Sequence, residues 1–364
     1  MEQERVATSD MEAWEDQWGA IDNGADVADA RGVEDRMDDV GIVGSKPREP
    51  PNPGSLCPPA DRIAHLPPPL RWLRVQACHT TSHRSPSVAG VAPSFSLASW
   101  NVHCGVDGWG RPFDVGALGA DLGADIVLVQ ESWRPSSGLS SAGIIAEAMG
   151  AELVETVLAP GRRGRPHQDA GPTWHQPGST FGGDHSLYLD PPTASTQRSN
   201  PPARYDEAEP GDWCIAIVSK LPVVNVRTFP LGQLRRDAAN RQLLVVDAVI
   251  DGRPVTVATA HLAHLTQGSH RQFRALRHTL RGLGGPRSAT VAGGDMNCWG
   301  PLVSLQVPRW RRAVRGPTWP AWRPHSQLDH LLVGGGLRVV SGEVVEETAS
   351  DHLPIRVVLE LGGD

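Results

Sequence analysis

Polar strings follow apolar, strand-like runs at five places in the chain, and their side chains are of types that bind cations or transfer protons. Three strings lie in the last quarter of the sequence, at Gly294–Asn297, Leu328–His330 and Ser350–His352. Two more lie far upstream, at Trp100-Asn101 and Gln130-Glu131. Because loops at strand ends hold functional side chains on a rigid frame, we expect the five strings to converge on one site.

The residue types in these strings suit the hydrolysis of a phosphate ester. That reaction needs a cation to neutralise the phosphate and a base to activate water. Magnesium prefers oxygen ligands and keeps several waters, so one or two carboxylates suffice to hold it. The candidate oxygen donors are Glu131, Asp295, Asp351, Asn101 and Asn297. The candidate groups for proton transfer near neutral pH are His261 and His352.

Each candidate taken alone has a structural alternative. Asp295 follows two glycines and could be a turn residue or a helix cap. Asp351 could cap a turn, and Asp329-His330 could be a surface pair. His103 has no assigned role, although its position two residues after Asn101 could direct it into the same cleft.

Apolar periodicity predicts the elements that would position these strings. Apolar runs predict strands at 96–100, 126–129, 153–157, 213–219, 223–229, 241–250, 255–260, 289–292, 328–333, 338–345 and 353–361. Helical spacing predicts helices at 113–122, 142–149 and 267–283. Since helices and hairpin-paired strands alternate irregularly along the chain, we expect mixed sheets.

Composition divides the chain into a leader and a catalytic domain. Residues 1–92 are first acidic and then rich in proline, and residues 1–50 carry 14 acidic against 5 basic side chains. Such a segment buries too little apolar surface to offset its chain entropy, so we expect it to be disordered. The catalytic domain is expected over 93–364, with a flexible insertion at about 159–211 that contains a weak strand near 187–189.

Composition also argues against several classes of protein. The five cysteines are scattered and form no CxxC pair, which argues against a zinc knuckle or a disulfide framework. The sequence has no apolar run of membrane-spanning length, so no membrane span is expected. The N-terminus is acidic where a signal peptide would be basic, so the expected location is cytoplasmic. No obligate protein partner is evident.

The ordered motifs together resemble the endonuclease/exonuclease/phosphatase superfamily, which has the fold of pancreatic-type deoxyribonuclease. The resemblance covers residues 94–362 and rests on motifs at Trp100-Asn101, Gln130-Glu131, His261-Leu262, Gly294–Asn297, Asp329-His330 and Ser350–Pro354. It implies an α+β fold, a four-layer α/β sandwich in which two mixed β-sheets pack face to face with helices outside. It also implies a Mg²⁺-dependent enzyme, with Mn²⁺ as a possible substitute.

The resemblance implies a role for each matching residue. Glu131 resembles the main magnesium ligand, with Asn101 beside it and Asp351 as a further metal candidate. His352 resembles the histidine that engages the scissile phosphate and the attacking water, and Asp329 resembles its orienting partner.

Three further matches complete the implied machinery. Asp295 resembles the residue that positions or deprotonates water, and Asn297 resembles a phosphate contact. His261 resembles the second histidine of the deoxyribonuclease and sphingomyelinase branches, where it implies an acid for the leaving group.

Substrate contacts are expected close to these motifs. Arg309, Arg311 and Arg312 lie around Trp310 on an expected helix or loop, and they are candidates to contact phosphate. A solvated helix face is the alternative interpretation. Trp299 follows the Gly294–Asn297 string and could stack on a base or face a lipid, with ordinary packing as the alternative.

Departures from family patterns narrow the substrate. Ser132-Trp133 follows Gln130-Glu131 where abasic-site nucleases carry a lysine, and Cys298-Trp299 stands where inositol-phosphate phosphatases carry Tyr-Arg. The leading hypothesis is therefore a metal-dependent phosphodiester hydrolase acting on a nucleic acid, a nuclease. The alternatives are a sphingomyelinase-like phospholipid or small-molecule phosphoesterase and, from a different class, a non-catalytic binding protein.

Overall fold

The computed structural model describes residues 92–163, 187–189 and 209–362, except 109, 235–236, 238 and 347. By its contacts the chain divides into the units Met1–Ser85 and Pro86–Asp364, and every described residue belongs to the second unit. The acidic and proline-rich leader expected over 1–92 lies outside the described residues, apart from residue 92. The same holds for most of the insertion expected at 159–211, although its two ends are strand residues.

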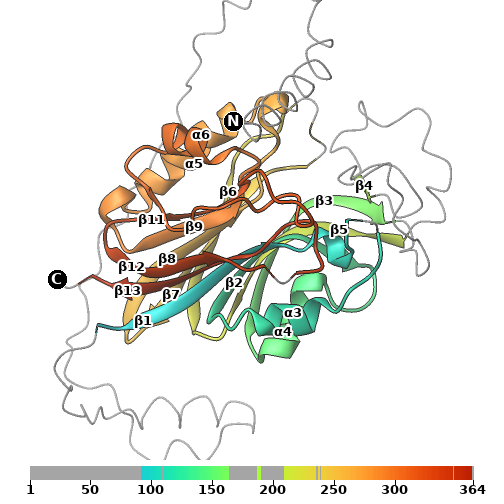
Figure 1. Cartoon of the computed structure of the whole chain (residues 1–364), viewed down its shortest axis with the longest axis horizontal. Coiled ribbons are helices and arrows are strands. Elements are labelled where there is room, and N and C mark those ends of the chain that lie inside the picture. Colours follow the sequence, from blue (N-terminus) through green and yellow to red (C-terminus); the bar gives the residue numbers. More distant parts are fainter. Residues whose placement is uncertain are drawn as a thin grey trace, which may run out of the picture. The chain divides into compact units, whose positions relative to one another are not determined.

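Two mixed β-sheets make up the centre of the described domain (Figure 1). The first sheet has seven strands in the order β12 (Leu337–Val344), β13 (Ile355–Leu361), β1 (Ser94–Asn101), β2 (Ile126–Pro135), β5 (Glu209–Ser219), β3 (Glu152–Arg163) and β4 (Leu187–Leu189). The second has six in the order β10 (Arg311–Arg312), β11 (Asp329–Val333), β9 (Thr290–Asp295), β8 (Arg253–Ala260), β7 (Gln242–Ile250) and β6 (Val223–Pro230). Within the described residues, β1 runs parallel to β2 and β8 parallel to β9, while the other paired strands are antiparallel.

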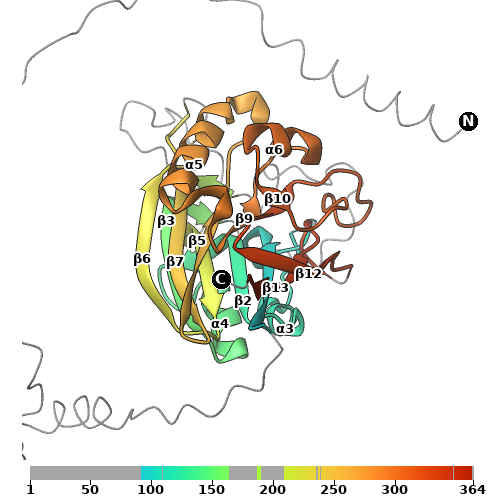
Figure 2. The ribbon, with the colours of Figure 1, turned by 90° about the vertical axis from the view of Figure 1, so that its left-hand side faces the viewer.

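Helices cover the outer faces of both sheets (Figure 2). Helices α3 (Val115–Asp121) and α4 (Ser141–Met149) share an apolar cluster with the seven-stranded sheet. Helices α5 (His270–Gly282) and α6 (Gly300–Gln306) share another with the six-stranded sheet. A third cluster lies between the sheets and joins residues of both, such as Leu128 and Val257. The expected four-layer sandwich is therefore confirmed.

Local sequence explains where the main helices begin and end. The side chain of Ser140 caps α4 by accepting a hydrogen bond from the backbone N–H of Gly143 at 3.0 Å, and Gly150 ends that helix in the left-handed conformation. Helix α5 buries Phe273, Leu276 and Leu280, which recur at helical spacing on one face. Between α5 and the preceding strand lies a short 3-10 helix, η6 (Leu265–Gln267), so α5 begins three residues later than expected.

Three features differ from the sequence-based expectations. Strand β2 continues to Pro135, well beyond the apolar run that ends at Val129. Helix α6 was not expected, since seven residues make less than two full turns and carry too little periodicity. The helix or loop expected around Trp310 is wrong for Arg311–Arg312, which form the edge strand β10 against β11.

Two further 3-10 helices are short, η3 (His103–Gly105) after β1 and η7 (Gly285–Arg287) before β9.

No helix of the described residues is both long enough and apolar enough to cross a membrane. The parallel pairs β1–β2 and β8–β9 are the strands that matter most for the site, because parallel neighbours bring their carboxyl ends to the same edge of a sheet.

Candidate active site

The five polar strings converge at one edge of the sandwich. Their candidate residues lie at or just beyond strand ends, with the exception of Glu131 inside β2, and nearly all are buried. Those that the structure brings together are Asn101, Glu131, His261, Asp295, Asn297, Asp329 and His352. They come from both sheets, so the site depends on the face-to-face packing of the sandwich.

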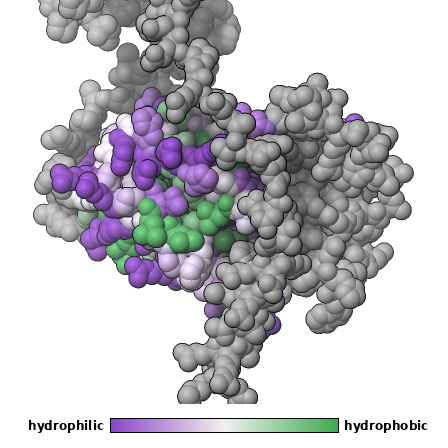
Figure 3. Space-filling model, turned by 90° about the horizontal axis from the view of Figure 1, so that it is seen from above, coloured by the Kyte–Doolittle hydropathy of each residue, from purple (hydrophilic) through white to green (hydrophobic). Residues whose placement is uncertain are grey.

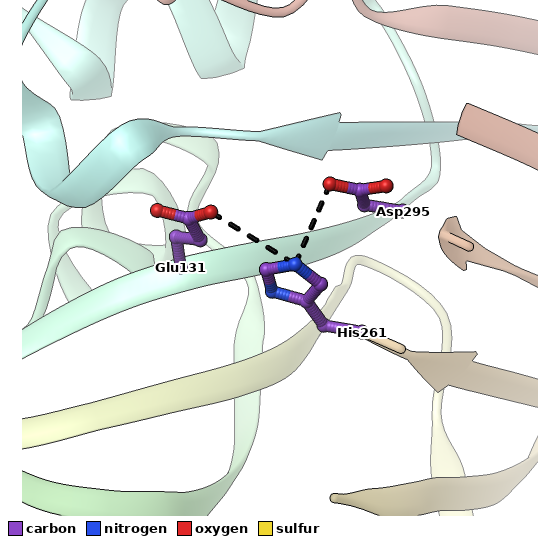
Figure 4. A group of neighbouring side chains, drawn as sticks. All are labelled: Glu131, His261 and Asp295. Carbon is purple, nitrogen blue, oxygen red and sulfur yellow. Dashed lines mark ion pairs between the residues drawn. The ribbon is translucent and has the colours of Figure 1, made fainter. Parts of the chain in front are cut away.

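One half of the site is a carboxylate–imidazole cluster (Figure 4). The Nε2 atom of His261 lies 3.4 Å from Oδ2 of Asp295 and 3.9 Å from Oε1 of Glu131. The Nδ2 atom of Asn101 donates to the same two carboxylate oxygens, at 3.0 Å to Glu131 and 3.1 Å to Asp295. The amide of Asn101 therefore links the side chains of Glu131 and Asp295 and holds their oxygens close together, where one cation could contact both.

A bulge in β2 turns Glu131 toward this cluster. The pairing of β2 with β5 shifts register between Val129 and Ser132, and Glu131 adopts a left-handed backbone with φ 54°. A bulge redirects a side chain that would otherwise alternate with its neighbours across the sheet. Non-glycine residues are rarely found in this conformation, and they concentrate at functional sites.

Gly294 allows the neighbouring strand β9 to bring Asp295 into the cluster. Its φ is 131°, and a Cβ at this position would overlap the carbonyl oxygen of Ala260. Only glycine can therefore occupy the position without strain. The backbone N–H of Leu262 donates to the carbonyl of Asp295 at 3.0 Å, which ties the chain after β8 to the end of β9.

The other half of the site is an oriented histidine. The Nδ1 atom of His352 lies 2.8 Å from Oδ2 of Asp329, and its Nε2 atom lies 3.8 Å from Oδ2 of Asp295. Burial alone would lower the pKa of this imidazole. The carboxylates of Asp329, Asp295 and Asp351 outweigh that effect and raise the pKa of His352 well above its usual value. His352 is therefore positively charged at neutral pH.

The pKa values of two other groups of the centre, Asp295 and His261, are shifted in opposite directions. Burial raises the pKa of Asp295 to about 7, with Asp329 and Glu131 adding to the effect and His352 opposing it. Burial lowers the pKa of His261 well below its usual value, and the positive charge of Arg241 lowers it further. The surroundings therefore favour the charged form of His352 and the neutral form of His261, and burial raises the pKa of Asp295 toward neutral pH.

The donor set fits a divalent cation. Two groups of three side chains each offer ligand atoms within 4.8 Å of one another: Glu131, His261 and Asp295, and Asp295, Asp329 and His352. The Oε2 atom of Glu131 is buried and accepts no hydrogen bond from any described residue. A buried carboxylate oxygen without a partner is costly unless a cation or a donor reaches it. The first group is the better fit, because His352 in the second is positively charged.

Asp351 and Asn297 lie beside this centre. The carboxylate of Asp351 has an oxygen 3.7 Å from Nδ1 of His103, and it belongs to neither donor group. Asn297 has φ 44°, and its amide nitrogen lies 3.1 Å from Nε2 of His261 and donates to the carbonyl of Leu262 at 2.9 Å. Asn297 therefore holds the imidazole of His261 with its Nε2 atom toward the cluster.

The candidate substrate contacts are more scattered. Arg311 donates to the carbonyl of Leu337, and Arg312 donates to the side chain of Gln327, so both guanidinium groups contribute to the packing of the sheet edge. Arg309 is exposed with a left-handed backbone. Trp299 is 55% exposed and lies two residues beyond Asn297. Of this set, Trp299 is the residue whose position in the chain best suits contact with a substrate.

The structure adds supporting residues that the sequence did not single out. The ring of Trp213 packs against His261 at a centroid distance of 5.0 Å, and Arg241 lies 4.9 Å from the centroid of the Trp213 ring. Arg241 also donates to the carbonyl of His261 at 3.2 Å, and Asp237 holds its guanidinium. These contacts join segments far apart in the sequence, so no local pattern could reveal them.

Comparison with known proteins agrees with this geometry. The family model of the Endonuclease/Exonuclease/phosphatase family matches residues 98–352. No curated protein sequence gives a significant match. Among solved structures, an endonuclease/exonuclease/phosphatase from Beutenbergia cavernae is 19% identical with a TM-score of 0.51, and 74% of this chain and 72% of that chain are covered.

A second solved structure, a family protein from Bacteroides thetaiotaomicron, is 14% identical with a TM-score of 0.50, and 75% of this chain and 100% of that chain are covered. Both similarities concern the fold, since identity is too low to transfer a substrate. The family match extends from β1 to the Ser350–His352 string and so includes every residue of the converged site. The chain belongs to the endonuclease/exonuclease/phosphatase family, a group of hydrolases that act on phosphoesters.

Proposed function

We propose that this chain hydrolyses a phosphodiester with the help of a bound divalent cation, Mg²⁺ first and Mn²⁺ as its substitute. One observation carries the proposal. The charged His352, held by Asp329, lies 3.8 Å from Oδ2 of Asp295. The Nε2 atom of the neutral His261 lies 3.4 Å from the same oxygen and 3.9 Å from Oε1 of Glu131. A proton donor, a proton acceptor and an anionic cation site would then share one buried cluster, which supports the proposal.

Glu131 would hold the cation, with Asn101 and His261 beside it, and the neighbouring Asp295 would act on the water. When bound, the cation would supply positive charge that stabilises the developing charge on the phosphate. Because burial and Arg241 lower its pKa, His261 is suited to accept a proton or bind a cation, not to donate a proton to the leaving group. This differs from the leaving-group role that the family resemblance implies.

The other residues act directly on the phosphate and the water. The Nε2–H of His352 would donate to a phosphate oxygen, because its Nδ1–H is already directed to Asp329. Asp295 has a pKa of about 7, close to the ideal for a general base at neutral pH, and would take the proton of the attacking water. Asn297 would position that water or a phosphate oxygen from the adjoining turn.

A nucleic-acid strand is the first substrate class to test. The exposed indole of Trp299 stands next to the Asn297 turn, where a base could stack on it. The test is hydrolysis of single-stranded DNA, duplex DNA and RNA by the full-length chain with Mg²⁺, with Mn²⁺ and with EDTA. His352→Ala serves as the matched inactive variant. Activity that survives both EDTA and His352→Ala would refute the proposed mechanism.

A phospholipid phosphodiester is the second candidate substrate class, and one observation favours it. The exposed Trp299 is followed by two exposed leucines, Leu302 and Leu305, which contribute nothing to the binding of a charged nucleic-acid backbone. Turnover of phospholipid head groups without turnover of DNA or RNA would select this candidate. A non-catalytic binding protein is the third alternative, and a failure to bind Mg²⁺ at all would favour it.

A further inference from the structure

Helix α5 presents a basic stripe to solvent on the side opposite its buried face. Arg271, Arg274, His278 and Arg281 are all exposed and recur at spacings of three and four, which places them on one face of the helix. The helix contains no acidic residue from His270 to Gly282. Among the described residues, none of these arginines forms an ion pair with a carboxylate. The stripe is therefore an uncompensated positive surface.

Helix α6 packs beside α5 and presents an apolar ridge. Leu302 is 38% exposed and Leu305 is 73% exposed, and their spacing places them on one side of the helix. Val303 points the other way and joins the same buried cluster as the inner face of α5. The ridge continues at Trp299, the residue that caps α6 next to the active-site turn.

Both helices lie on the same outer side of the six-stranded sheet. Figure 3 looks down on the side of the domain where α5 and α6 lie, and its coloured part has a hydrophobic area bordered by hydrophilic residues. Exposed apolar surface surrounded by polar residues marks an interaction site more often than chance exposure does. We call the face formed by Arg271, Arg274, Arg281, Leu302 and Leu305 the α5–α6 face.

We propose that the α5–α6 face binds the surface of an anionic lipid bilayer. Arginines near such a surface are attracted by its negative potential. Exposed leucines gain free energy when they enter the boundary between head groups and acyl chains. A nucleic acid would also attract the arginine stripe, yet it offers no apolar layer for Leu302 and Leu305. The apolar ridge therefore favours a lipid partner over a nucleic acid.

This inference goes beyond hydrolysis, because it requires no catalytic residue. It would bring Trp299, which lies two residues beyond Asn297, close to the lipid surface. The orientation suits a phosphodiester that is itself part of a lipid head group. Binding and catalysis can nevertheless be measured separately, since Leu302, Leu305 and the α5 arginines are exposed and take no part in the ion pairs of the carboxylate–imidazole cluster in the described structure.

The test is co-sedimentation of the full-length chain with vesicles of phosphatidylcholine alone and with mixed phosphatidylcholine–phosphatidylglycerol vesicles. We expect binding to the mixed vesicles that weakens with salt, and little binding to the neutral vesicles. Leu302→Ser with Leu305→Ser should weaken binding on the order of 10-fold. Arg271→Gln with Arg274→Gln and Arg281→Gln should weaken it by a similar factor or more.

Matched variants separate specific binding from general damage. Replacing the same three arginines by lysine keeps the charge and should preserve most of the binding. Val224→Ser with Val226→Ser alters two exposed valines on β6, and this pair should leave binding unchanged. His352→Ala should bind vesicles like the unaltered chain, so a failure of catalysis would not be mistaken for a failure of docking. Thermal melting of each variant confirms that it is folded.

Three outcomes would overturn the proposal. The first is an absence of binding to the mixed vesicles. The second is vesicle binding that the serine pair does not weaken, since the leucines would then have no part in it. The third is a self-associating chain whose dimer, and not its vesicle binding, is lost in the serine pair. Binding of a DNA oligonucleotide that depends on the arginines, with no vesicle binding, would assign the stripe to nucleic acid.

Discussion

Nδ1 of His352 lies 2.8 Å from Oδ2 of Asp329, and the side chain of Asp329 is fully buried. The contact fixes both the charge and the direction of the imidazole. Because Nδ1–H donates to Asp329, the other nitrogen must face Asp295, which lies 3.8 Å away. The second oxygen of Asp329 is buried and accepts no hydrogen bond from a described residue. This pair thus has the geometry of a carboxylate that orients a catalytic imidazole.

Asp329→Asn should lower activity and shift its pH dependence. The substitution removes the negative charge that raises the pKa of His352, so the imidazole will lose its proton at a lower pH. We expect kcat/KM to fall on the order of 10²-fold, and the alkaline limb of the pH profile to move to lower pH. The check is kcat/KM measured against pH, with Asp251→Asn in an exposed turn as the control. An unchanged alkaline limb would show that His352 does not act as the acid.

The same ion pair should stabilise the fold in a defined pH range. The folded-state pKa of His352 is raised, so its contribution is fully present below the pKa of an unfolded histidine. The contribution is lost as pH rises through the folded-state value. In Asp329→Asn, denaturant unfolding should therefore show a weaker decline of stability from neutral to alkaline pH than in the unaltered chain.

Glu131→Gln should abolish the response to a divalent cation while leaving the fold intact. Glutamine keeps the size of the side chain and removes the charge next to Asp295, where Glu131 contributes to the raised pKa. Without a cation we expect the variant to be as stable as the unaltered chain, or more stable, because a buried like-charge repulsion is relieved. Activity should fall on the order of 10²-fold.

Thermal unfolding in a magnesium titration tests this prediction directly. Ligand binding to the folded state alone raises the melting temperature as the ligand concentration exceeds its dissociation constant. The unaltered chain should show such a rise with Mg²⁺, and Glu131→Gln should not. Glu155→Gln is the control, since Glu155 is a partly buried glutamate of β3 outside both donor groups. An equal rise in Glu131→Gln would remove Glu131 from the cation site.

Gly294→Ala should prevent the domain from folding normally. The new Cβ would overlap the carbonyl oxygen of Ala260, and φ at 131° is open only to glycine. We expect a loss of about 4 kcal/mol or more, as for the most damaging single substitutions. The control is Gly282→Ala in α5, where a Cβ meets nothing within 4 Å and alanine favours the helix. Equal free energies of unfolding for the two variants, measured with urea, would show that the backbone at Gly294 does not lie against the carbonyl oxygen of Ala260.

Much of this site could be predicted because its residues occupy strand ends. Asp295 ends β9 after one apolar run, and Asp329 begins β11 before another, and both runs are readable in the sequence. The order of the motifs then resembled one family, and the family match confirmed it. The apolar pattern predicted mixed sheets, and the resemblance to the family implied the four layers that the structure has.

What could not be predicted depends on backbone irregularity and on contacts between sheets. The polar residues from Gln130 to Ser132 end the apolar run, although β2 continues through them by means of a bulge. The packing of Trp213 on His261 joins a strand of one sheet to the residue that follows a strand of the other. Neither feature has a periodic signal, because both are decided by tertiary packing.

The basic stripe of α5 was readable in the sequence and was nevertheless missed. The segment from His270 to Gly282 has four arginines and no acidic residue. Its apolar positions predict the buried face correctly, and the arginines lie on the opposite face. In the arginine patch expected at 309–312, by contrast, the guanidinium groups of Arg311 and Arg312 donate hydrogen bonds to Leu337 and Gln327 at a sheet edge.

His330→Gln should make the domain less sensitive to acid. His330 is fully buried in β11, where its Nε2 lies 2.9 Å from the carbonyl of Cys298, and burial together with nearby Arg312 lowers its pKa to about 4. An unfolded chain protonates this histidine at a higher pH than the folded chain does. The folded state therefore loses stability relative to the unfolded state as pH falls from the unfolded pKa toward 4, by about 3 kcal/mol in total.

Glutamine retains an N–H group that can reach the carbonyl of Cys298, and it does not titrate. We expect His330→Gln to lose some stability at neutral pH because the side chain packs less well. Between neutral pH and pH 4, the unaltered chain should lose about 3 kcal/mol more than the variant does. Urea unfolding at several pH values measures this difference, with His325→Gln at an exposed position as the control. If the free energy of unfolding fell equally with pH in His330→Gln and in the unaltered chain, the pKa of His330 would not be lowered in the folded state. That result would contradict the prediction.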